Sequence, residues 1–269
     1  MVETITSPRN DRVKFLCKLR DRGKRTRYGM FLIEGSRELS RAIRCGVAME
    51  SVFFCEEFFK GDGQRNLVSC AEGAGIQLCA VSGNVFEKIS SRENCDGVIG
   101  LANSWRTDLV PATLPENSLI LVAEGIEKPG NLGALVRSAE SAGVRALILC
   151  NSVADIFNPN VVRASQGAIF SLPIITADNE TTFAFLKENS VKIFAATPHA
   201  SALYFNEDFR SSTAIAVGSE HGGLSNFWLG NCEIRKISLP QIGICDSLNV
   251  NDAAAIILYE VLRQRMIGN

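Results

Sequence analysis

The sequence predicts an α/β protein of two domains, the second of which contains a parallel sheet. Its 269 residues are enough for two domains of ordinary size. A hydrophobic fraction of 46% and a charged fraction of 21% are typical of a globular protein with a substantial core. Short apolar runs alternate with stretches of helical periodicity along the chain, and this alternation predicts strands separated by helices.

Residues 1–103 are expected to form the first, smaller domain. Ser7 and Pro8 have the residue types that begin helices, and a rough apolar stripe continues from there to Gly23. Gly35 marks the turn from an apolar strand into another helix, which ends near Gly46. Apolar runs predict strands at 30–33, 52–55, 76–81 and 97–102, and further helices are expected at 66–73 and 86–89.

A linker is expected at 104–117, because this stretch contains two prolines and has no periodicity. Residues 118–269 then form the second domain. Its strands are predicted at 118–122, 145–150, 172–176, 191–196 and 213–217, and its helices at 131–142, within 159–170 and at 181–188. Apolar strands of this kind are typical of a parallel sheet, in which ligand-binding loops follow the carboxyl ends of the strands.

The last part of the chain predicts a strand, a loop and a long helix. Alternating apolar residues indicate a strand that ends at Pro240, and a glycine-containing loop follows over 241–246. Residues 247–250 alternate polar and apolar types but are too few for a strand of their own. Asn251 and Asp252 are of the types that cap helices, so the helix is expected to begin at Ala253. A polar loop between a strand end and a helix start is a usual place for a small-molecule site, and equally an ordinary connection.

Positive charge is concentrated near the amino terminus, although the net charge is only −1. Nine basic and two acidic residues lie between Arg9 and Arg27. Such a cluster favours contact with a phosphate backbone. A solvated, charged helix face explains the same pattern, and the sequence leaves both interpretations open.

The cysteines indicate a reducing compartment. The nine are scattered, odd in number and without C-x-x-C spacing, and the chain has only two histidines. We therefore expect reduced thiols in a cytoplasmic protein and no metal site. No run of about 18 apolar residues predicts a membrane span, and the first residues lack the apolar segment of a secretory signal.

Three polar loops follow apolar strands, at Glu124–Arg137, Gly218–Leu224 and Gln241–Asn249. None has the G-x-G-x-x-G pattern of dinucleotide-binding proteins or the Gly-Lys-Ser/Thr of a Walker loop, which disfavours a nicotinamide-dependent enzyme. His221 lies close to Ser219, as in hydrolases, but no G-x-S-x-G elbow accompanies the pair. We expect His221 to be a turn residue without a catalytic role.

Taken together, the residues of these loops resemble the three motifs of the SpoU (TrmH-like) RNA ribose methyltransferases of the SPOUT superfamily. The first motif is Asn131-Leu-Gly133 with Arg137, the second is Gly218-Ser-Glu-His-Gly-Gly-Leu224, and the third is Leu239-Pro240 with Ser247-Leu-Asn-Val250. The connecting stretch at 158–168 is also similar to that family. The amino-terminal part, with Phe31-Leu-Ile-Glu-Gly35-x-Arg37, resembles the substrate-binding domain often fused to it.

The resemblance implies a fold and an activity. The implied fold is a parallel sheet with a deep trefoil knot, preceded by an L30e-like RNA-binding domain. The implied activity is S-adenosylmethionine-dependent methylation of a ribose 2′-hydroxyl in structured RNA, by a homodimer. The added amino-terminal domain favours ribosomal RNA as the substrate. A transfer RNA methyltransferase, or an RNA-binding protein that has lost catalysis, stays open.

The same resemblance implies site residues. A catalytic group is expected from Arg137, Asn131, Glu220, Ser247 and Asn249. An arginine stays protonated, so charge stabilisation and phosphate anchoring suit Arg137 better than the role of a base; a surface or dimer-interface arginine is the alternative, and the other residues can be loop caps. Cofactor contacts are expected mainly through backbone groups, from Gly218, Leu239, Leu248, Ser219, Pro240 and Gln241.

Two positions depart from the family pattern. Asn251-Asp252 follows Val250 where relatives usually continue with Ser-Val, and this puts details of the cofactor pocket in doubt. Asp96 stands before Gly97 where many relatives carry glutamine, and this leaves the RNA target open.

Overall fold

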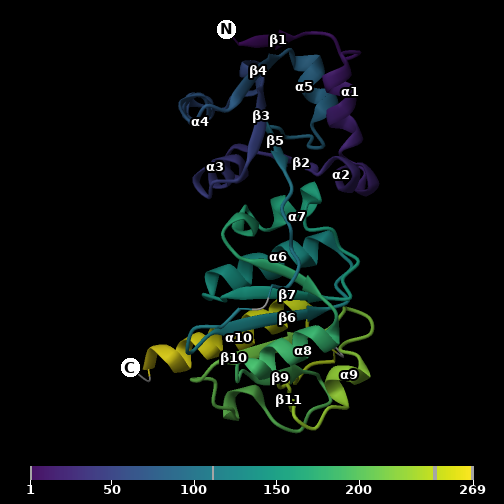
Figure 1. Cartoon of the computed structure of the whole chain (residues 1–269), viewed down its shortest axis with the longest axis vertical. Helices are drawn as coiled ribbons and strands as arrows, with labels where there is room; N and C mark the ends of the chain where they lie inside the picture. The colour runs from purple at the N-terminus through teal and green to yellow at the C-terminus, as the bar shows by residue number, and fades with distance from the viewer. Residues whose placement is uncertain (1, 111, 245–246, 268–269) are drawn as a thin grey trace. The chain divides into compact units, whose positions relative to one another are not determined.

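The computed structural model describes residues 2–110, 112–244 and 247–267, and the chain divides into two compact units (Figure 1). The first unit is Met1–Arg106 together with Asp155–Phe170, and the second is Thr107–Ala154 together with Ser171–Asn269. The α/β class predicted from the sequence is confirmed. The segment Asp155–Phe170 packs with the first unit although it lies far along the chain. The predicted boundaries 1–103, 104–117 and 118–269 did not include this segment in the first domain.

A mixed five-stranded sheet forms the centre of the first unit, in the order β1-β4-β3-β5-β2. Strand β5 is antiparallel to both of its neighbours, and the other pairs are parallel. The strands are β1 (Glu3–Ile5), β2 (Met30–Glu34), β3 (Met49–Phe54), β4 (Gln77–Val81) and β5 (Val98–Asn103). The helices are α1 (Asp11–Lys18), α2 (Arg22–Tyr28), α3 (Ser36–Arg44), α4 (Asp62–Gly73), α5 (Gly83–Ile89) and α7 (Pro159–Ala164), with 3-10 turns η1 (Glu56–Phe58) and η2 (Ala168–Phe170).

Two features of the first unit differ from the prediction. The basic stretch forms two helices instead of one, because Asn10 caps α1 by accepting from the backbone N of Arg12 at 2.8 Å and Asp21 caps α2 by accepting from Lys24 N at 3.0 Å. Strand β1, which was not predicted, has only three residues and pairs with β4 at one side of the sheet. A strand this short leaves almost no alternation to detect.

The second unit contains a six-stranded parallel sheet in the order β11-β9-β10-β6-β7-β8. Its strands are β6 (Leu119–Glu124), β7 (Ala146–Cys150), β8 (Ile174–Ala177), β9 (Lys192–Ala196), β10 (Thr213–Val217) and β11 (Arg235–Ile237). Its helices are α6 (Pro129–Ser141), α8 (Asn179–Glu188), α9 (Asn226–Leu229) and α10 (Val250–Ile267), with the 3-10 turn η3 (Tyr204–Asn206). Because all strands are parallel, the loops after β9, β10 and β11 lie at one edge.

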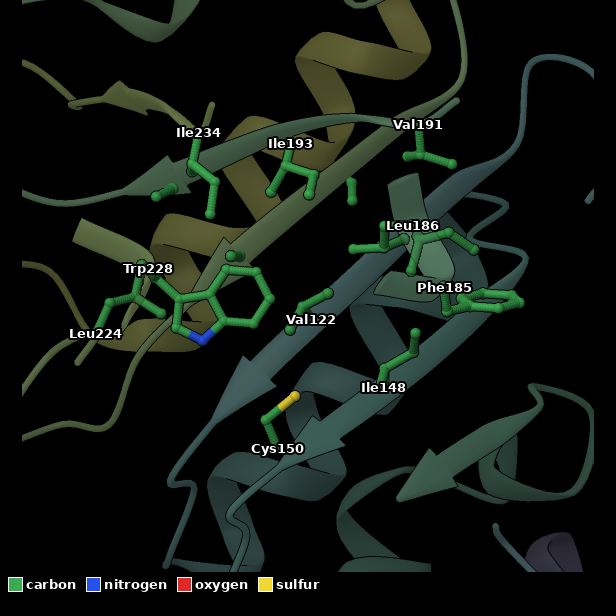
Figure 2. Close-up of a cluster of buried hydrophobic side chains, with 14 of the residues drawn as sticks. Val122, Ile148, Cys150, Phe185, Leu186, Val191, Ile193, Leu224, Trp228 and Ile234 are labelled. Carbon is green, nitrogen blue, oxygen red and sulfur yellow. The ribbon is translucent and has the colours of Figure 1, made fainter. Parts of the chain in front are cut away.

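Both faces of this sheet are buried. On one face, alternate strand residues such as Val122 and Ile148 pack with Phe185 and Leu186 of α8 and with Trp228 of α9 (Figure 2). Helices α6 and α10 pack against each other, and α10 also contacts β10. Burial on both faces explains why β6 and β10 are apolar at every position except Glu124 and Thr213.

Helix α10 begins earlier than predicted. It starts at Val250, so Asn251 and Asp252 lie in its first turn and not ahead of it. The capping residue is Asn249, whose Oδ1 accepts from the backbone N of Asn251 at 2.9 Å while its carbonyl accepts from Ala253 N at 3.0 Å. The prediction was wrong because Asn249, Asn251 and Asp252 all have side chains of capping type. Only the backbone conformation decides which of them caps the helix.

Eight cysteines lie in the described part of the chain and all are free thiols. Among the described residues, no cluster of three or more His, Cys, Asp or Glu side chains is placed to hold a metal ion. None of the helices described is long and apolar enough to cross a membrane.

Candidate active site

A cavity of about 340 Å³ lies in the second unit, at the carboxyl ends of β9, β10 and β11 and beside the start of α10. The loop after each of these strands contributes to its wall. The lining residues are Ala196, Thr197, Pro198, His199, Val217, Gly218, Ser219, Glu220, His221, Gly222, Gly223, Leu224, Leu229, Leu239, Gln241, Ser247, Leu248, Val250 and Ala253. Apolar side chains and backbone groups of a glycine-rich turn thus dominate the wall, as in sites for small organic ligands.

The turn from Gly218 to Leu224 is closed on itself. Ser219 N donates to Gly223 O at 3.1 Å, and Gly223 N donates back to Ser219 O at 3.0 Å. Gly218 has no room for a side chain, because a Cβ atom there would stand 2.0 Å from the carbonyl carbon of Gly223. The turn therefore brings two backbone segments against the cavity at a distance that only glycine permits.

Glu124 stabilises the end of this turn. Its buried carboxylate accepts from the backbone N of Ser225 at 2.7 Å and from Asn179 Nδ2 at 2.6 Å. Asn179 in turn accepts from Trp228 Nε1 at 3.1 Å through its Oδ1. Both carboxylate oxygens are therefore paired, as a buried charge requires. The sequence contained Glu124 in a polar loop but gave no sign of this role, since its partners lie in distant segments.

A chain of side-chain hydrogen bonds reaches the cavity wall from two helices. Asn131 of α6 donates through Nδ2 to the carboxylate of Glu220. Asn251 of α10 donates through Nδ2 to Asn131 Oδ1 at 3.1 Å. Asn131 and Glu220 belong to two of the loops that the sequence predicted to be polar, and Asn251 lies two residues beyond the third; the fold brings the three together. Glu220 is the one acid among the described residues that line the cavity.

Seven of the predicted site residues line the cavity: Gly218, Ser219, Glu220, Leu239, Gln241, Ser247 and Leu248. Pro240 and Asn249 do not, although both flank lining residues, and Asn249 caps α10. Asn131 stands behind Glu220 and contacts the wall through that residue. The structure therefore assembles most of the set, while the chemical role of each residue stays a prediction.

Arg137 is the predicted residue that the fold does not bring to the cavity. It lies on the exposed side of α6, and within the described residues no hydrogen bond or ion pair joins its side chain to another group. An unpaired, exposed guanidinium is free to contact a phosphate or a second protein chain.

Sequence reasoning missed a fourth loop, Thr197-Pro198-His199, which follows β9 and lines the cavity. Strand β9 was predicted, and its neighbour β10 carries the glycine turn. Adjacent parallel strands end at the same edge, so the order of the strands in the sheet would have found this loop. His221, predicted as a turn residue, does lie in the turn, and it lines the cavity together with His199.

Several basic residues of the stretch 9–27 have partners inside the protein. Arg25 is buried, donates to Leu19 O and Arg20 O, and pairs with Asp155 at 2.6 Å. Arg20 donates to Lys88 O and Ser90 O, each at 2.7 Å. For the buried Arg25, neither phosphate contact nor a solvated face describes the side chain, whereas Arg20 is exposed and also bound to the backbone. Arg12 pairs with Glu3, and Lys14 pairs with Asp11 at 2.8 Å. Lys18 and Arg27 are exposed, and the guanidinium of Arg27 stands over the ring of Tyr28 at 5.7 Å.

Asp96, the second departure from the expected pattern, has a clear contact. Its carboxylate accepts from the backbone N of Ser36 at 2.7 Å, at the first residue of α3. An acidic group there is favourable, because the helix amino terminus carries partial positive charge and unpaired N–H groups.

The fold and this cavity define a class of protein. Its members have a parallel α/β domain with a small-molecule site at one edge of the sheet, and a further domain precedes it in the sequence. The profile of the SpoU rRNA methylase family matches residues 118–259, and that of the MRM3-like substrate binding domain matches residues 10–100. The chain belongs to the SpoU rRNA methylase family.

Individual relatives extend the likeness over the whole chain. The 23S rRNA (uridine(2479)-2'-O)-methyltransferase of Streptomyces viridochromogenes is 30% identical over 261 residues, covering 93% of this chain and 88% of the relative. A crystal structure of an RNA 2'-O ribose methyltransferase matches with a TM-score of 0.86 and 39% identity, covering 98% of this chain and 99% of the other. An AdoMet-bound rRNA methyltransferase from Sinorhizobium meliloti gives a TM-score of 0.88 at 25% identity, with 97% and 98% covered.

Proposed function

We propose that this protein transfers a methyl group from S-adenosylmethionine to a ribose 2′-hydroxyl of ribosomal RNA. The observation that carries the proposal is the cavity at the carboxyl edge of the second sheet, whose wall contains Glu220 held by Asn131. Family membership supports the reaction, and the names of several relatives, which act on 23S rRNA, support the substrate.

The cavity fits the proposed cofactor in size and chemistry. A volume of about 340 Å³ lies within the range of small-molecule sites. Leu224, Leu239 and Leu248 offer apolar surface for a nucleoside base, and the turn at Gly218 offers backbone N–H and C=O groups without an intervening side chain. When bound, the cofactor supplies an activated methyl group.

The protein has to orient the acceptor and take its proton. A 2′-hydroxyl is a weak nucleophile, so both tasks lower the barrier. In the proposal, Glu220 accepts a hydrogen bond or the proton from the acceptor side, and Asn131 holds the carboxylate in place. Ser247, an exposed residue at the cavity wall, orients the ribose. Asn249 maintains the start of α10, which carries part of that wall.

Arg137 completes the site through a second copy of the chain. The exposed side of α10 carries a stripe of apolar residues, with Ile256, Tyr259 and Met266 exposed by 39%, 50% and 72%. Such a stripe on a helix that packs against α6 favours a homodimer through this surface. A dimer of this kind would bring the free guanidinium of Arg137 to the interface, where it anchors the phosphate beside the target ribose.

The first unit is proposed to hold the structured RNA. Exposed basic residues of α1 and α2, including Lys18 and Arg27, face away from the core and suit a phosphate backbone, and Tyr28 adds an exposed aromatic ring beside Arg27. An RNA substrate made in the cytoplasm supports a cytoplasmic location for the protein.

Replacement of Arg137 by alanine tests the mechanism. We expect methyl transfer to fall by at least about 100-fold, because a charge-assisted contact to the target is lost. The melting temperature should not change, since the side chain is exposed and unpaired among the described residues. Arg145→Ala, also exposed in the second unit, is the control and should retain full activity. Full activity of Arg137→Ala would refute the assignment.

Calorimetric titration separates the enzyme from an RNA-binding protein that has lost catalysis. The proposal expects S-adenosylmethionine to bind the purified protein with a dissociation constant in the micromolar range, as is typical of enzyme substrates. No heat of binding at millimolar cofactor would favour the non-catalytic alternative.

A further inference from the structure

We propose that Asn251 is a positioning residue, whose side-chain amide orients Asn131 and, through Asn131, the Glu220 carboxylate at the cavity wall. The inference rests on the function proposed for that cavity. It concerns the position at which the chain departs from its family pattern, so it is a property of this protein and not of the family motif.

The direction of the hydrogen bonds follows from the chemistry of the groups. An ionised carboxylate only accepts, so Asn131 has to present its NH2 group to Glu220. Its carbonyl oxygen then points the opposite way and needs a donor. Asn251 Nδ2 is that donor, at 3.1 Å. The charge on Glu220 therefore determines the orientation of both amides in turn, and a residue at 251 that cannot donate breaks the chain.

Asn251 is itself held in place by the helix start. Its backbone N donates to Asn249 Oδ1 at 2.9 Å, within the capped first turn of α10. Helix α10 packs against α6, which carries Asn131. The contact between the two side chains therefore joins two packed helices to the turn that carries Glu220, and it fixes the carboxylate relative to the wall contributed by Val250 and Ala253.

The side-chain carbonyl oxygen of Asn251 argues against a purely structural role. Its Oδ1 is buried and has no hydrogen-bond partner among the described residues. A buried acceptor without a partner costs stability, so an asparagine is a poor choice if the residue serves only to begin a helix. The donating NH2 group, which meets Asn131, is the part of the side chain that the contacts explain.

Two substitutions test the donor. Asn251→Ala removes it, and we expect kcat to fall about tenfold while KM for S-adenosylmethionine changes less than about twofold, because the carboxylate is misplaced but the cofactor contacts remain. Asp252→Ala is the matched control: this neighbour lies exposed in the same turn, and its substitution should leave kcat unchanged. Unchanged kcat in Asn251→Ala would overturn the proposal.

Asn251→Asp supplies a readout that a structural role would not move. When ionised, aspartate accepts only and cannot donate to Asn131 Oδ1; when protonated, it can. The activity of Asn251→Asp relative to wild type should therefore rise as the pH is lowered through the pKa of the new carboxyl group. The same ratio for Asn251→Ala should stay flat. A flat ratio for Asn251→Asp would contradict the directional chain.

A third measurement keeps the inference separate from the proposed reaction. In NMR spectra of the full chain without cofactor or RNA, the side-chain amide protons of Asn131 should shift in Asn251→Ala and not in Asp252→Ala. If wild-type protein transfers no methyl group but this shift occurs, the proposed function fails and the positioning contact stands. If the Asn131 signals of Asn251→Ala do not differ from those of wild type, the contact itself is refuted.

Discussion

At the scale of single residues, the site depends on groups whose surroundings leave little choice of side chain. Gly218 has no space for a Cβ atom, Glu124 has both carboxylate oxygens paired, and Asn131 has both ends of its amide bonded. Each of these constraints is local and can be tested by one substitution with a matched control.

Gly218→Ala should disrupt the turn from Gly218 to Leu224, where the cofactor is proposed to bind. The new methyl carbon would stand 2.0 Å from the backbone of Gly223, so the turn has to open. We expect the affinity for S-adenosylmethionine to fall at least about tenfold in calorimetry, because contacts through the turn are lost. Gly130→Ala, in α6 and with nothing within 4 Å of the added atom, is the control and should bind normally. Equal affinities of the two variants would contradict the packing described for the turn.

Cys150 should be the least reactive of the described thiols. Burial raises the pKa of the Cys150 thiol to about 11, against a weaker opposite effect of its hydrogen bond with Thr182. A pKa this high leaves about one molecule in a thousand as the reactive thiolate at pH 8, and alkylation requires the thiolate. Mass spectrometry after mild iodoacetamide treatment should find the exposed Cys45, Cys70 and Cys232 modified and Cys150 intact. Early modification of Cys150 would show that its surroundings open readily.

At the scale of elements, helix α2 and the segment from Asp155 are joined by a buried ion pair. The side chains of Arg25 and Asp155 are 4% and 15% exposed and lie 2.6 Å apart. Removal of one partner leaves the other charge buried and unpaired, so Arg25→Ala should lower the free energy of unfolding of the first unit by about 3 kcal/mol. Chemical denaturation measures this, with the exposed Lys18→Ala as control. A loss no larger than that of the control would contradict a structural role for Arg25.

The elements also show what the sequence could and could not predict. Apolar runs located β6, β7, β9 and β10 within about two residues, because strands buried on both faces carry polar residues only at their ends. Strand β1 and the break between α1 and α2 were missed, since three residues or one capping aspartate carry little periodicity. The start of α10 was placed too late, because Asn249, Asn251 and Asp252 are all of capping types.

The site was predictable in composition but not in assembly. The resemblance singled out seven residues that do line the cavity, yet it offered no sign of Glu124, of His199 or of the link through Asn251. The hydrogen bonds of Glu124 and Asn251 join positions 55 to 120 residues apart, and no local pattern encodes them. Likewise, the basic stretch could not reveal that Arg25 pairs inside the protein, because its partner Asp155 lies far along the chain. The expected trefoil knot stays a prediction.

At the scale of the whole molecule, the proposed active site requires two copies of the chain. Light scattering should give twice the 29.2 kDa mass of one chain. Ile256→Glu introduces a charge into the exposed apolar stripe of α10 and should produce monomers with little methyl transfer, because burying an unpaired charge at an interface is costly. Lys192→Glu, an exposed change on the same unit, should remain dimeric and active. A fully active monomer would remove the second copy from the proposed site.

The most direct test is methyl transfer itself. Purified protein, labelled S-adenosylmethionine and ribosomal RNA from a strain that lacks the protein should yield label in RNA at one ribose 2′-oxygen, mapped by its resistance to alkaline cleavage. We expect wild type and Asp252→Ala to label this position, Arg137→Ala not to label it, and Asn251→Ala to label it about tenfold more slowly. Label on a base, or none on ribosomal RNA while the cofactor binds, would refute 2′-O-methylation of ribosomal RNA by this protein.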